Sequence, residues 1–305
     1  MGRKQRKFVP DAVNHCYQRT TDGSVIFYNV SDYLVCFTQI CVAAIKHKVK
    51  VLAITLMPDH LHQSVIAHDK EQLSAYVQAY AGPFAAAHNR ICKREKPLFQ
   101  RPFGSVPKVG DKNVRSNLVY VGNNGPERKL SAKAEEYPWS FLAYYRNPHP
   151  YSEPLKLREA SRPMRRAVSV VNDRRSRMRP LKYQTLQWMF KPLSRKEKLQ
   201  LVDFVVTQYN VIDYDAAAAF FGGFPQMIEA MHITKGSEYE IQEEFEGWSD
   251  TVYSSMCRLV LSCYPDVDIH QVLSLPEEKR HALSNLIQQR VKASRRQVEK
   301  FLRIM

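Results

Sequence analysis

The sequence predicts an α+β fold, in which a ferredoxin-like (split βαβ) antiparallel sheet with helices on one face is followed by an all-α C-terminal region. Two observations support this class. Between residues 12 and 109, segments follow one another in the order strand, helix, strand, strand, helix, strand. From residue 181 to residue 305, apolar residues recur at helical spacing.

The four extended segments are the most readily recognised elements, because β-branched and aromatic residues gather in each of them. Pro58-Asp59 separates the second segment from the third and is typical of the tight turn of an antiparallel pair. The sequence predicts extended chain at residues 12–20, 49–57, 61–67 and 97–109.

Three helices alternate with these segments, and each has apolar side chains at a period near 3.6. Gly82-Pro83 is expected to kink or divide the second helix, and Gly125-Pro126 is expected to end the third. With all helices on one face, the other face of the sheet would be free for substrate. The predicted helices are residues 31–48, 69–92 and 112–123.

The chain falls into three parts. Residues 1–148 form the sheet domain, which Tyr137-Pro138-Trp139-Ser140 closes. Residues 149–180 are rich in arginine and proline and predict a weakly structured basic linker, either a solvated tether or an arm that follows phosphates. Residues 181–305 are helical, and residues 277–304 fit a helix-turn-helix or a plain helical hairpin equally well.

The whole chain is strongly basic. It has 305 residues, 44% of them hydrophobic, a formal net charge of +15 and a pI of about 9.5. This charge favours a polyanionic partner, nucleic acid above all, over a basic protein without such a partner. The six cysteines form no Cys-x-x-Cys motif, which indicates reduced thiols. Without a secretory signal or an apolar run of ~18 residues, we expect a cytoplasmic, nucleoid-associated protein with no membrane partner.

His60 and His62 are the first candidates for chemistry. They follow the apolar run of the second strand and are separated by Leu61, so both imidazoles lie on one face of a strand while Leu61 points into the core. Two imidazoles on a rigid strand make a natural metal pair. The alternative is a histidine pair on the surface or satisfied within the core.

Tyr120 and Asn124 are the second pair of candidates, because residues four apart share one helix face. A divalent ion on His60, His62 and the side-chain oxygen of Asn124 would polarise a phosphate, and two nitrogens with one amide oxygen suit Mg²⁺ or Mn²⁺. Tyr120 would then act as the nucleophile on phosphorus. The alternative is a half-buried packing tyrosine, unless the histidines face it.

Five motifs in this order resemble the IS200-like Y1 transposases, and most closely the REP-associated tyrosine transposases. Together they span about residues 8–145. Gly125 departs from the pattern, since the family usually has proline there, and glycine is expected to relax the exit of the helix. The motifs are His15-Cys16-Tyr17-Gln18-Arg19, Leu56-Met57-Pro58-Asp59-His60-Leu61-His62, Leu98-Phe99-Gln100-Arg101-Pro102-Phe103, Tyr120-Val121-Gly122-Asn123-Asn124 and Tyr137-Pro138-Trp139-Ser140.

The resemblance implies an HUH endonuclease and strand transferase that cuts single-stranded DNA next to a hairpin and forms a 5′-phosphotyrosine. It assigns the nucleophile to Tyr120 and the metal ligands to His60, His62 and Asn124. A domesticated relative that binds hairpin DNA without cutting, and an RNA-binding protein on the same sheet, remain alternatives, as do monomer and homodimer. The candidate DNA-contacting residues are Arg3, Lys4, Arg6, Lys7, Arg19, Arg101, Lys108, Arg295 and Arg296.

Overall fold

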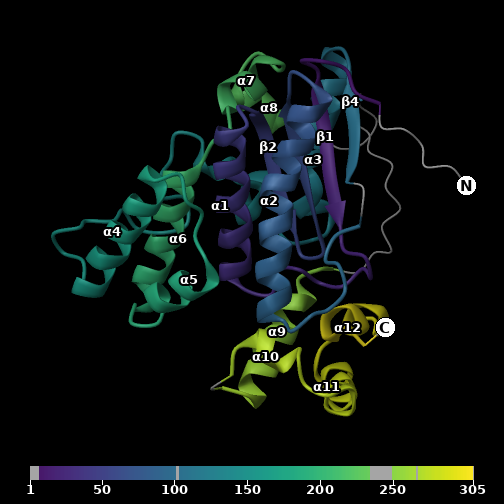
Figure 1. Ribbon diagram of the computed structural model, residues 1–305, viewed down its shortest axis with the longest axis vertical. Helices are drawn as coiled ribbons and strands as arrows, with labels where there is room; N and C mark the ends of the chain where they lie inside the picture. The colour runs from purple at the N-terminus through teal and green to yellow at the C-terminus, as the bar shows by residue number, and fades with distance from the viewer. Residues whose placement is uncertain (1–6, 101–102, 234–248, 266, 305) are drawn as a thin grey trace, which may run out of the picture.

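The four strands form one antiparallel sheet in a computed structural model that describes residues 7–100, 103–233, 249–265 and 267–304 (Figure 1). The strand order is β2-β3-β1-β4, with β1 paired to β3 on one side and to β4 on the other. The mixed α/β class with an antiparallel sheet is therefore confirmed. The strands are β1 (Val13–Arg19), β2 (Lys50–Met57), β3 (His60–Ile66) and β4 (Gly104–Lys108).

Helices make up most of the remaining described chain. Short 3-10 turns at Ala134–Glu136, Pro138–Ser140 and Leu142–Tyr144 lie between the third helix and the fourth. The helices are α1 (Val30–Lys46), α2 (Lys70–Ile91), α3 (Asp111–Glu127), α4 (Arg162–Ser176), α5 (Tyr183–Phe190), α6 (Arg195–Tyr209), α7 (Tyr214–Ala219), α8 (Phe224–His232), α9 (Val252–Cys263), α10 (Ile269–Val272), α11 (Glu277–Arg290) and α12 (Arg295–Leu302).

Helices cover both faces of the sheet, so the expectation of helices on one face and an open second face is wrong. Neighbouring residues of β3 point in opposite directions. Gln63 donates to the hydroxyl of Tyr80 in α2 at 2.9 Å, whereas Ser64 donates to Asn117 in α3 at 2.8 Å. The reason is that α3 carries its own apolar side chains, and these pack with Leu52 against the second face.

Two Gly-Pro pairs lie inside helices, so Gly82-Pro83 does not divide its helix and Gly125-Pro126 does not end its helix, contrary to the expectation. The α2 helix runs without interruption through Pro83, and α3 continues through Pro126 to Glu127. A residue before proline is pushed out of the helical region mainly by the clash of its Cβ with the proline ring. Glycine has no Cβ, so both helices can continue.

The basic segment 149–180 is not weakly structured throughout, because α4 lies within it. The side chain of Ser161 caps the helix by accepting from the backbone nitrogen of Met164. Met164, Ala167, Val168 and Val171 are buried, at the spacing of one helix face. This apolar stripe packs with α5 and α6, while Arg162, Arg165 and Arg166 are exposed. The prediction weighed the arginines and prolines and overlooked the stripe.

The C-terminal helices α9 to α12 surround an apolar cluster of their own, below the sheet in Figure 1. Val25 and Tyr28, which precede α1, belong to the same cluster, so these helices dock directly onto the sheet domain. The side chains of Ser294 and Gln297 form a capping box at the start of α12. In the described parts of the chain, no helix has the length and apolar character needed to cross a membrane.

Candidate active site

His60 and His62 lie side by side at the start of β3. Both point to the face of the sheet that α3 covers, and their ring centroids are 4.9 Å apart. Each is buried, with 5% and 2% of its surface exposed. Leu61 between them is fully buried in the core with α1 and α2, as the alternation predicted. The pair therefore occupies an interior edge of the sheet rather than an open surface.

The α3 helix is held on the sheet by hydrogen bonds that fix its rotation. Thr55 of β2 donates to the carbonyl of Val121 at 2.7 Å, and Ser64 donates to Asn117 at 2.8 Å. Tyr120 consequently lies against the histidines, with its ring centroid 5.3 Å from that of His62 in an edge-on arrangement. The structure thus brings together three of the four residues that the sequence proposed for chemistry, His60, His62 and Tyr120.

Asn124 lies one turn beyond Tyr120 and is almost fully buried. Its amide nitrogen donates to the carbonyl oxygen of Tyr120 at 2.8 Å, so its side-chain oxygen is the atom that could bind an ion. Asn123, by contrast, donates to the carbonyl of Met231 in α8 at 2.7 Å and holds two helices together. Of the two consecutive asparagines, Asn123 has a structural role, and Asn124 shares the helix side of Tyr120.

Each histidine of the pair is held through its Nδ1 atom. His60 Nδ1 lies 2.6 Å from a carboxylate oxygen of Asp59, and His62 Nδ1 lies 2.9 Å from Nε2 of His15 on β1. His62 Nε2 is buried and has no hydrogen-bond partner among the described residues. An Nδ1–H that donates to such a partner leaves Nε2 with a lone pair for a metal ion.

Burial also favours the neutral form of the His62 and His15 rings, the form in which an imidazole binds a metal ion. It lowers the pKa of His62 well below its usual value, and the neighbouring His60 adds to this effect. Burial lowers the pKa of His15 to about 3, with a contribution from Lys108. Burial alone would raise the pKa of Asp59, but His60 and Lys300 lower it below its usual value, so this carboxylate is charged.

The donor set fits a hard divalent ion only when Asn124 is included. Three or more His, Cys, Asp or Glu side chains do not gather into a metal-binding group anywhere in the described chain. The unpartnered Nε2 of His62 is nevertheless the kind of buried polar atom that needs a ligand. His60, His62 and the Asn124 oxygen would supply two nitrogens and one oxygen and leave positions for water and phosphate.

A cavity of about 390 Å³ opens beside His60 between the sheet domain and α12. Its wall carries four cationic side chains and two carboxylates, Asp59 and Asp250. Lys300 donates to Asp59 at 3.1 Å, so α12 reaches the residue that holds His60. Burial and the nearby Asp59 raise the pKa of Asp250 to about 6. The four cations are Arg19, Arg128, Arg296 and Lys300.

The predicted DNA-contacting residues are dispersed in the structure. Arg19 and Arg296 line the cavity beside His60, from β1 and α12 respectively. Lys108, at the end of β4, is half-buried, and burial lowers its pKa. Arg295 is exposed and pairs with Glu299 at 2.8 Å. Lys7 is exposed near the N-terminus. Four others lie outside the described residues: Arg3, Lys4, Arg6 and Arg101.

Four residues of the site had no role in the sequence prediction: His15, Asp59, Arg128 and Lys300. His15 and Asp59 stood in the quoted motifs. The contact of His15 with His62 depends on strand register, whereas Asp59 is the neighbour of His60 in the chain. For the other two, helical spacing was an available signal. Arg128 follows Asn124 by four residues, and Lys300 follows Arg296 by four.

Comparison with known proteins gives one relevant finding. No protein-family model matches the chain, and no curated protein matches its sequence. Among solved structures, the chain is similar to a REP-associated tyrosine transposase bound to a REP hairpin, with 14% identity and a TM-score of 0.39. The match covers 46% of this chain and 81% of the other. At this level of likeness, the function is argued from the geometry of the site.

Proposed function

We propose that the protein is a metal-dependent single-strand DNA endonuclease and strand transferase of the IS200-like Y1 (HUH) type. The observation that carries the proposal is the position of the Tyr120 ring against His62, with His60 beside it. The order of elements and the strand order β2-β3-β1-β4 support a ferredoxin-like assignment for the sheet domain.

In this proposal His60, His62 and Asn124 hold one Mg²⁺ or Mn²⁺ ion. When bound, the ion would act as a Lewis acid on the scissile phosphate. The Tyr120 oxygen attacks the phosphorus next to a DNA hairpin and gives up its proton to solvent water. The bond from phosphorus to the 3′ oxygen breaks, and that oxygen takes up a proton. The products are a 5′-phosphotyrosine and a 3′-hydroxyl, and attack by another 3′-hydroxyl rejoins the strands.

The chain's own residues prepare this step. The hydrogen bonds from Thr55 and Ser64 fix the rotation of α3 and therefore the direction of Tyr120. Arg19 and Arg128 supply positive charge along the cavity wall next to His60, where the phosphates of the strand would lie. Preorganised charge of this kind accounts for much of the catalysis of phosphoryl transfer.

The test is cleavage of hairpin DNA that carries single-stranded flanks, in the presence of Mn²⁺. Wild type should form a covalent protein–DNA adduct, and Tyr120→Phe should lose the adduct and at least about 10³-fold in cleavage rate. Tyr264→Phe, at the end of α9, is the matched control and should cleave normally. Equal cleavage by wild type and Tyr120→Phe would contradict the proposal.

The same assay separates the enzyme from the binding-only alternative. If the wild type binds the hairpin tightly but does not cut it, and His60→Ala leaves that binding unchanged, the chain is a DNA-binding module. Competition between the hairpin DNA and the RNA of the same sequence identifies an RNA-binding protein.

A further inference from the structure

The lobe formed by α4, α5 and α6 has a groove that the proposed function does not use. Figure 1 shows this lobe on the far side of α1 from the sheet. The groove has a volume of about 620 Å³ and lies where the start of α4 meets the end of α5. Its walls include three arginines of α4 with Trp188, Met189 and Pro192, and the arginines are Arg162, Arg165 and Arg166.

Trp188 is the unusual member of this groove, because 44% of its surface is exposed. Its neighbours Leu186 and Met189 are buried and hold α5 on the lobe, so the tryptophan is not needed to fill the core. The guanidinium of Arg166 lies over its ring, with Cζ 4.8 Å from the ring centroid. A large aromatic ring is therefore held at the surface by a cation.

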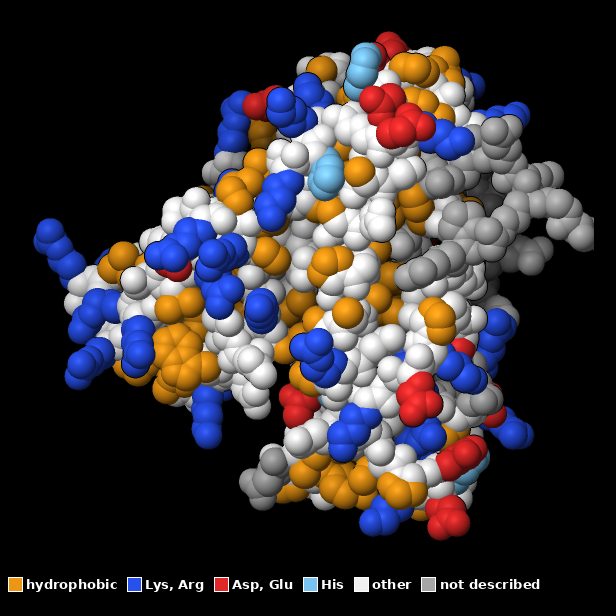
Figure 2. Space-filling view, viewed as in Figure 1, with side chains coloured by type: hydrophobic (Ala, Val, Ile, Leu, Met, Phe, Trp, Pro, Cys, Tyr) orange, Lys and Arg blue, Asp and Glu red, His pale blue; other side chains and the backbone are white. Residues whose placement is uncertain are grey.

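The charge around the groove is strongly one-sided. The described side chains that line it include three arginines and no carboxylate. The C-terminal end of α4 carries three more arginines: Arg174, Arg175 and, at its C-cap, Arg177. Figure 2 shows Lys and Arg side chains gathered over this lobe around a hydrophobic patch. Such a surface attracts a polyanion.

An exposed aromatic ring among arginines has a specific use with single strands. An unpaired base can stack on an aromatic side chain or on a guanidinium plane, while neighbouring cations bind the flanking phosphates. A paired base is stacked inside its duplex and does not offer its face in this way. The combination of Trp188 with Arg166 thus favours single-stranded over double-stranded nucleic acid.

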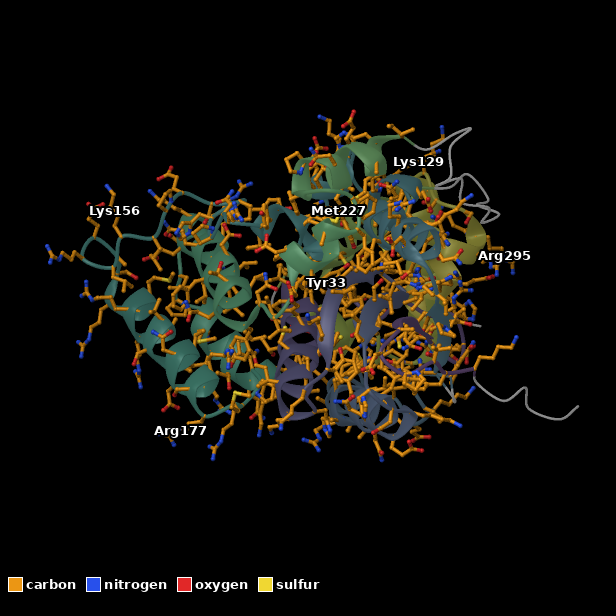
Figure 3. All side chains as sticks on the ribbon, turned by 90° about the horizontal axis from the view of Figure 1, so that it is seen from above. Tyr33, Lys129, Lys156, Arg177, Met227 and Arg295 are labelled. Carbon is orange, nitrogen blue, oxygen red and sulfur yellow. The ribbon has the colours of Figure 1, made fainter. Side chains whose placement is uncertain are left out.

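We propose that this α4–α5 groove is a second binding site for a single-stranded polynucleotide. A base stacks on Trp188 and Arg166, and Arg162 and Arg165 bind phosphates. The groove is remote from the candidate active site: Figure 3 shows Arg177 of this lobe and Arg295 of α12 on opposite sides of the molecule. The inference shares with the proposed function only the class of ligand and does not depend on the chemistry of Tyr120.

The first experiment uses the full chain carrying Tyr120→Phe as parent, so that DNA is bound without being cut. The probe is a mixed-sequence single strand of about six nucleotides, a length such sites accept. The strand should quench tryptophan fluorescence in the parent, and most of that quenching should disappear in the parent carrying Trp188→Phe. Quenching that is the same in both chains overturns the proposal.

The second experiment separates the charge of the groove from the charge of the lobe. Arg162→Gln should raise the strand concentration that gives half-maximal quenching about tenfold and reduce the slope of log affinity against log salt by about 0.7, because it removes one phosphate contact. Arg177→Gln removes the same charge from an arginine that pairs with Asp173, outside the groove, and should change neither quantity. If the two variants behave alike, the groove is not the binding site.

Three further arms identify the ligand. A duplex of the same sequence should quench much less than the strand, and equal quenching contradicts a single-strand site. A DNA strand and an RNA strand of the same sequence are compared directly, and the one that quenches more strongly identifies the ligand as DNA or RNA. If neither strand quenches the fluorescence, the proposal is overturned, and an acidic protein becomes the expected partner of the groove.

The stacking contribution is tested by affinity. Binding is measured with a fluorescein-labelled strand. The parent should bind two strands per chain, and the parent carrying Trp188→Ala should bind one. Leu157→Ala replaces an equally exposed apolar residue outside the groove and should leave both sites occupied. Unaltered binding by the parent carrying Trp188→Ala would contradict only the groove proposal. Cleavage of hairpin DNA by the Tyr120→Phe parent would contradict only the proposed function.

Discussion

At the scale of single residues, the chemistry depends on which ring nitrogen of each histidine keeps its lone pair. Asp59 and His15 each lie at hydrogen-bond distance from an Nδ1 atom of the pair, so the proposed metal ion would bind the two Nε2 atoms. Partners of this kind fix the orientation and the basicity of metal ligands. The strand pattern could predict that His60 and His62 share a face, but the partner of His62 comes from another strand.

Removal of the Asp59 carboxylate should weaken metal binding without touching a ligand. Asp59→Asn should lower the affinity for Mn²⁺ about 10- to 100-fold, because His60 loses the partner that orients it. Calorimetric titration with Mn²⁺ measures this. Asp173→Asn, which removes an exposed carboxylate from α4, is the control, and an equal affinity in both variants would show that Asp59 does not support the site.

The pair Asn123 and Asn124 shows how far local sequence patterns can predict the role of a single residue. Both lie in the motif, and helical spacing from Tyr120 selected Asn124 as the ligand candidate. The structure gives Asn123 a bond to Met231, and this contact depends on α8, which begins about a hundred residues later. No local pattern contains that information. The ligand role of Asn124 remains a prediction.

At the scale of elements, the sequence predicted strands and helices by their periods, and the structure has an element at each predicted place. The sequence did not predict how the helices are distributed between the two faces of the sheet. The third helix was predicted, but its burial against the second face follows from packing with α7 and α8. The α4 helix was missed because its four buried residues stand among many arginines.

Gly125 has a role in packing rather than in ending the helix. A Cβ at this position would lie 2.7 Å from Cβ of Tyr137, whose hydroxyl donates to the carbonyl of Leu56 beside the histidine motif. Gly125→Ala should therefore push Tyr137 away from the end of α3 and lower the free energy of unfolding by about 1–3 kcal/mol. Chemical denaturation measures the change.

Gly82→Ala is the matched control for this prediction. It is also a helical glycine before a proline, so it adds the same clash with the proline ring, but a Cβ there would contact nothing within 4 Å. The difference between the two variants isolates the contact with Tyr137. Equal destabilisation would mean that the close approach of Tyr137 is unimportant.

At the scale of the whole molecule, a buried ion pair joins the C-terminal helices to the sheet domain. His270 of α10 lies 2.9 Å from Asp32 of α1, and Tyr183 of α5 donates to the same carboxylate at 2.7 Å. Burial alone would lower the pKa of His270, but Asp32 and Asp268 raise it to about 11. Three distant segments thus meet at one carboxylate, a contact that no sequence pattern indicated.

His270→Gln should remove about 3 kcal/mol of stability near pH 6, since it leaves a buried carboxylate without its charged partner. Because the pKa of His270 is raised above 6.5, the contribution of the pair is complete below pH 6.5 and declines as the pH rises toward 11. On the acid side, burial would raise the pKa of Asp32, but His270 lowers it to about 2, so the contribution disappears as the pH falls from 3.8 through 2.

Denaturation of wild type and His270→Gln across this pH range measures the difference. The gap in stability should be widest between about pH 4 and 6.5 and should narrow above that range. His281→Gln replaces an exposed histidine of α11 and should show no such gap. A gap for His270→Gln that grows with rising pH would contradict a protonated His270.

The most direct test of the site is to locate a manganese ion in crystals soaked in Mn²⁺, by its anomalous scattering. We expect one peak bonded to Nε2 of His60, Nε2 of His62 and the side-chain oxygen of Asn124, with the Tyr120 hydroxyl facing it across the position of the phosphate. A peak held by other residues, or no peak at this edge of the sheet at saturating Mn²⁺, would contradict the proposed metal site.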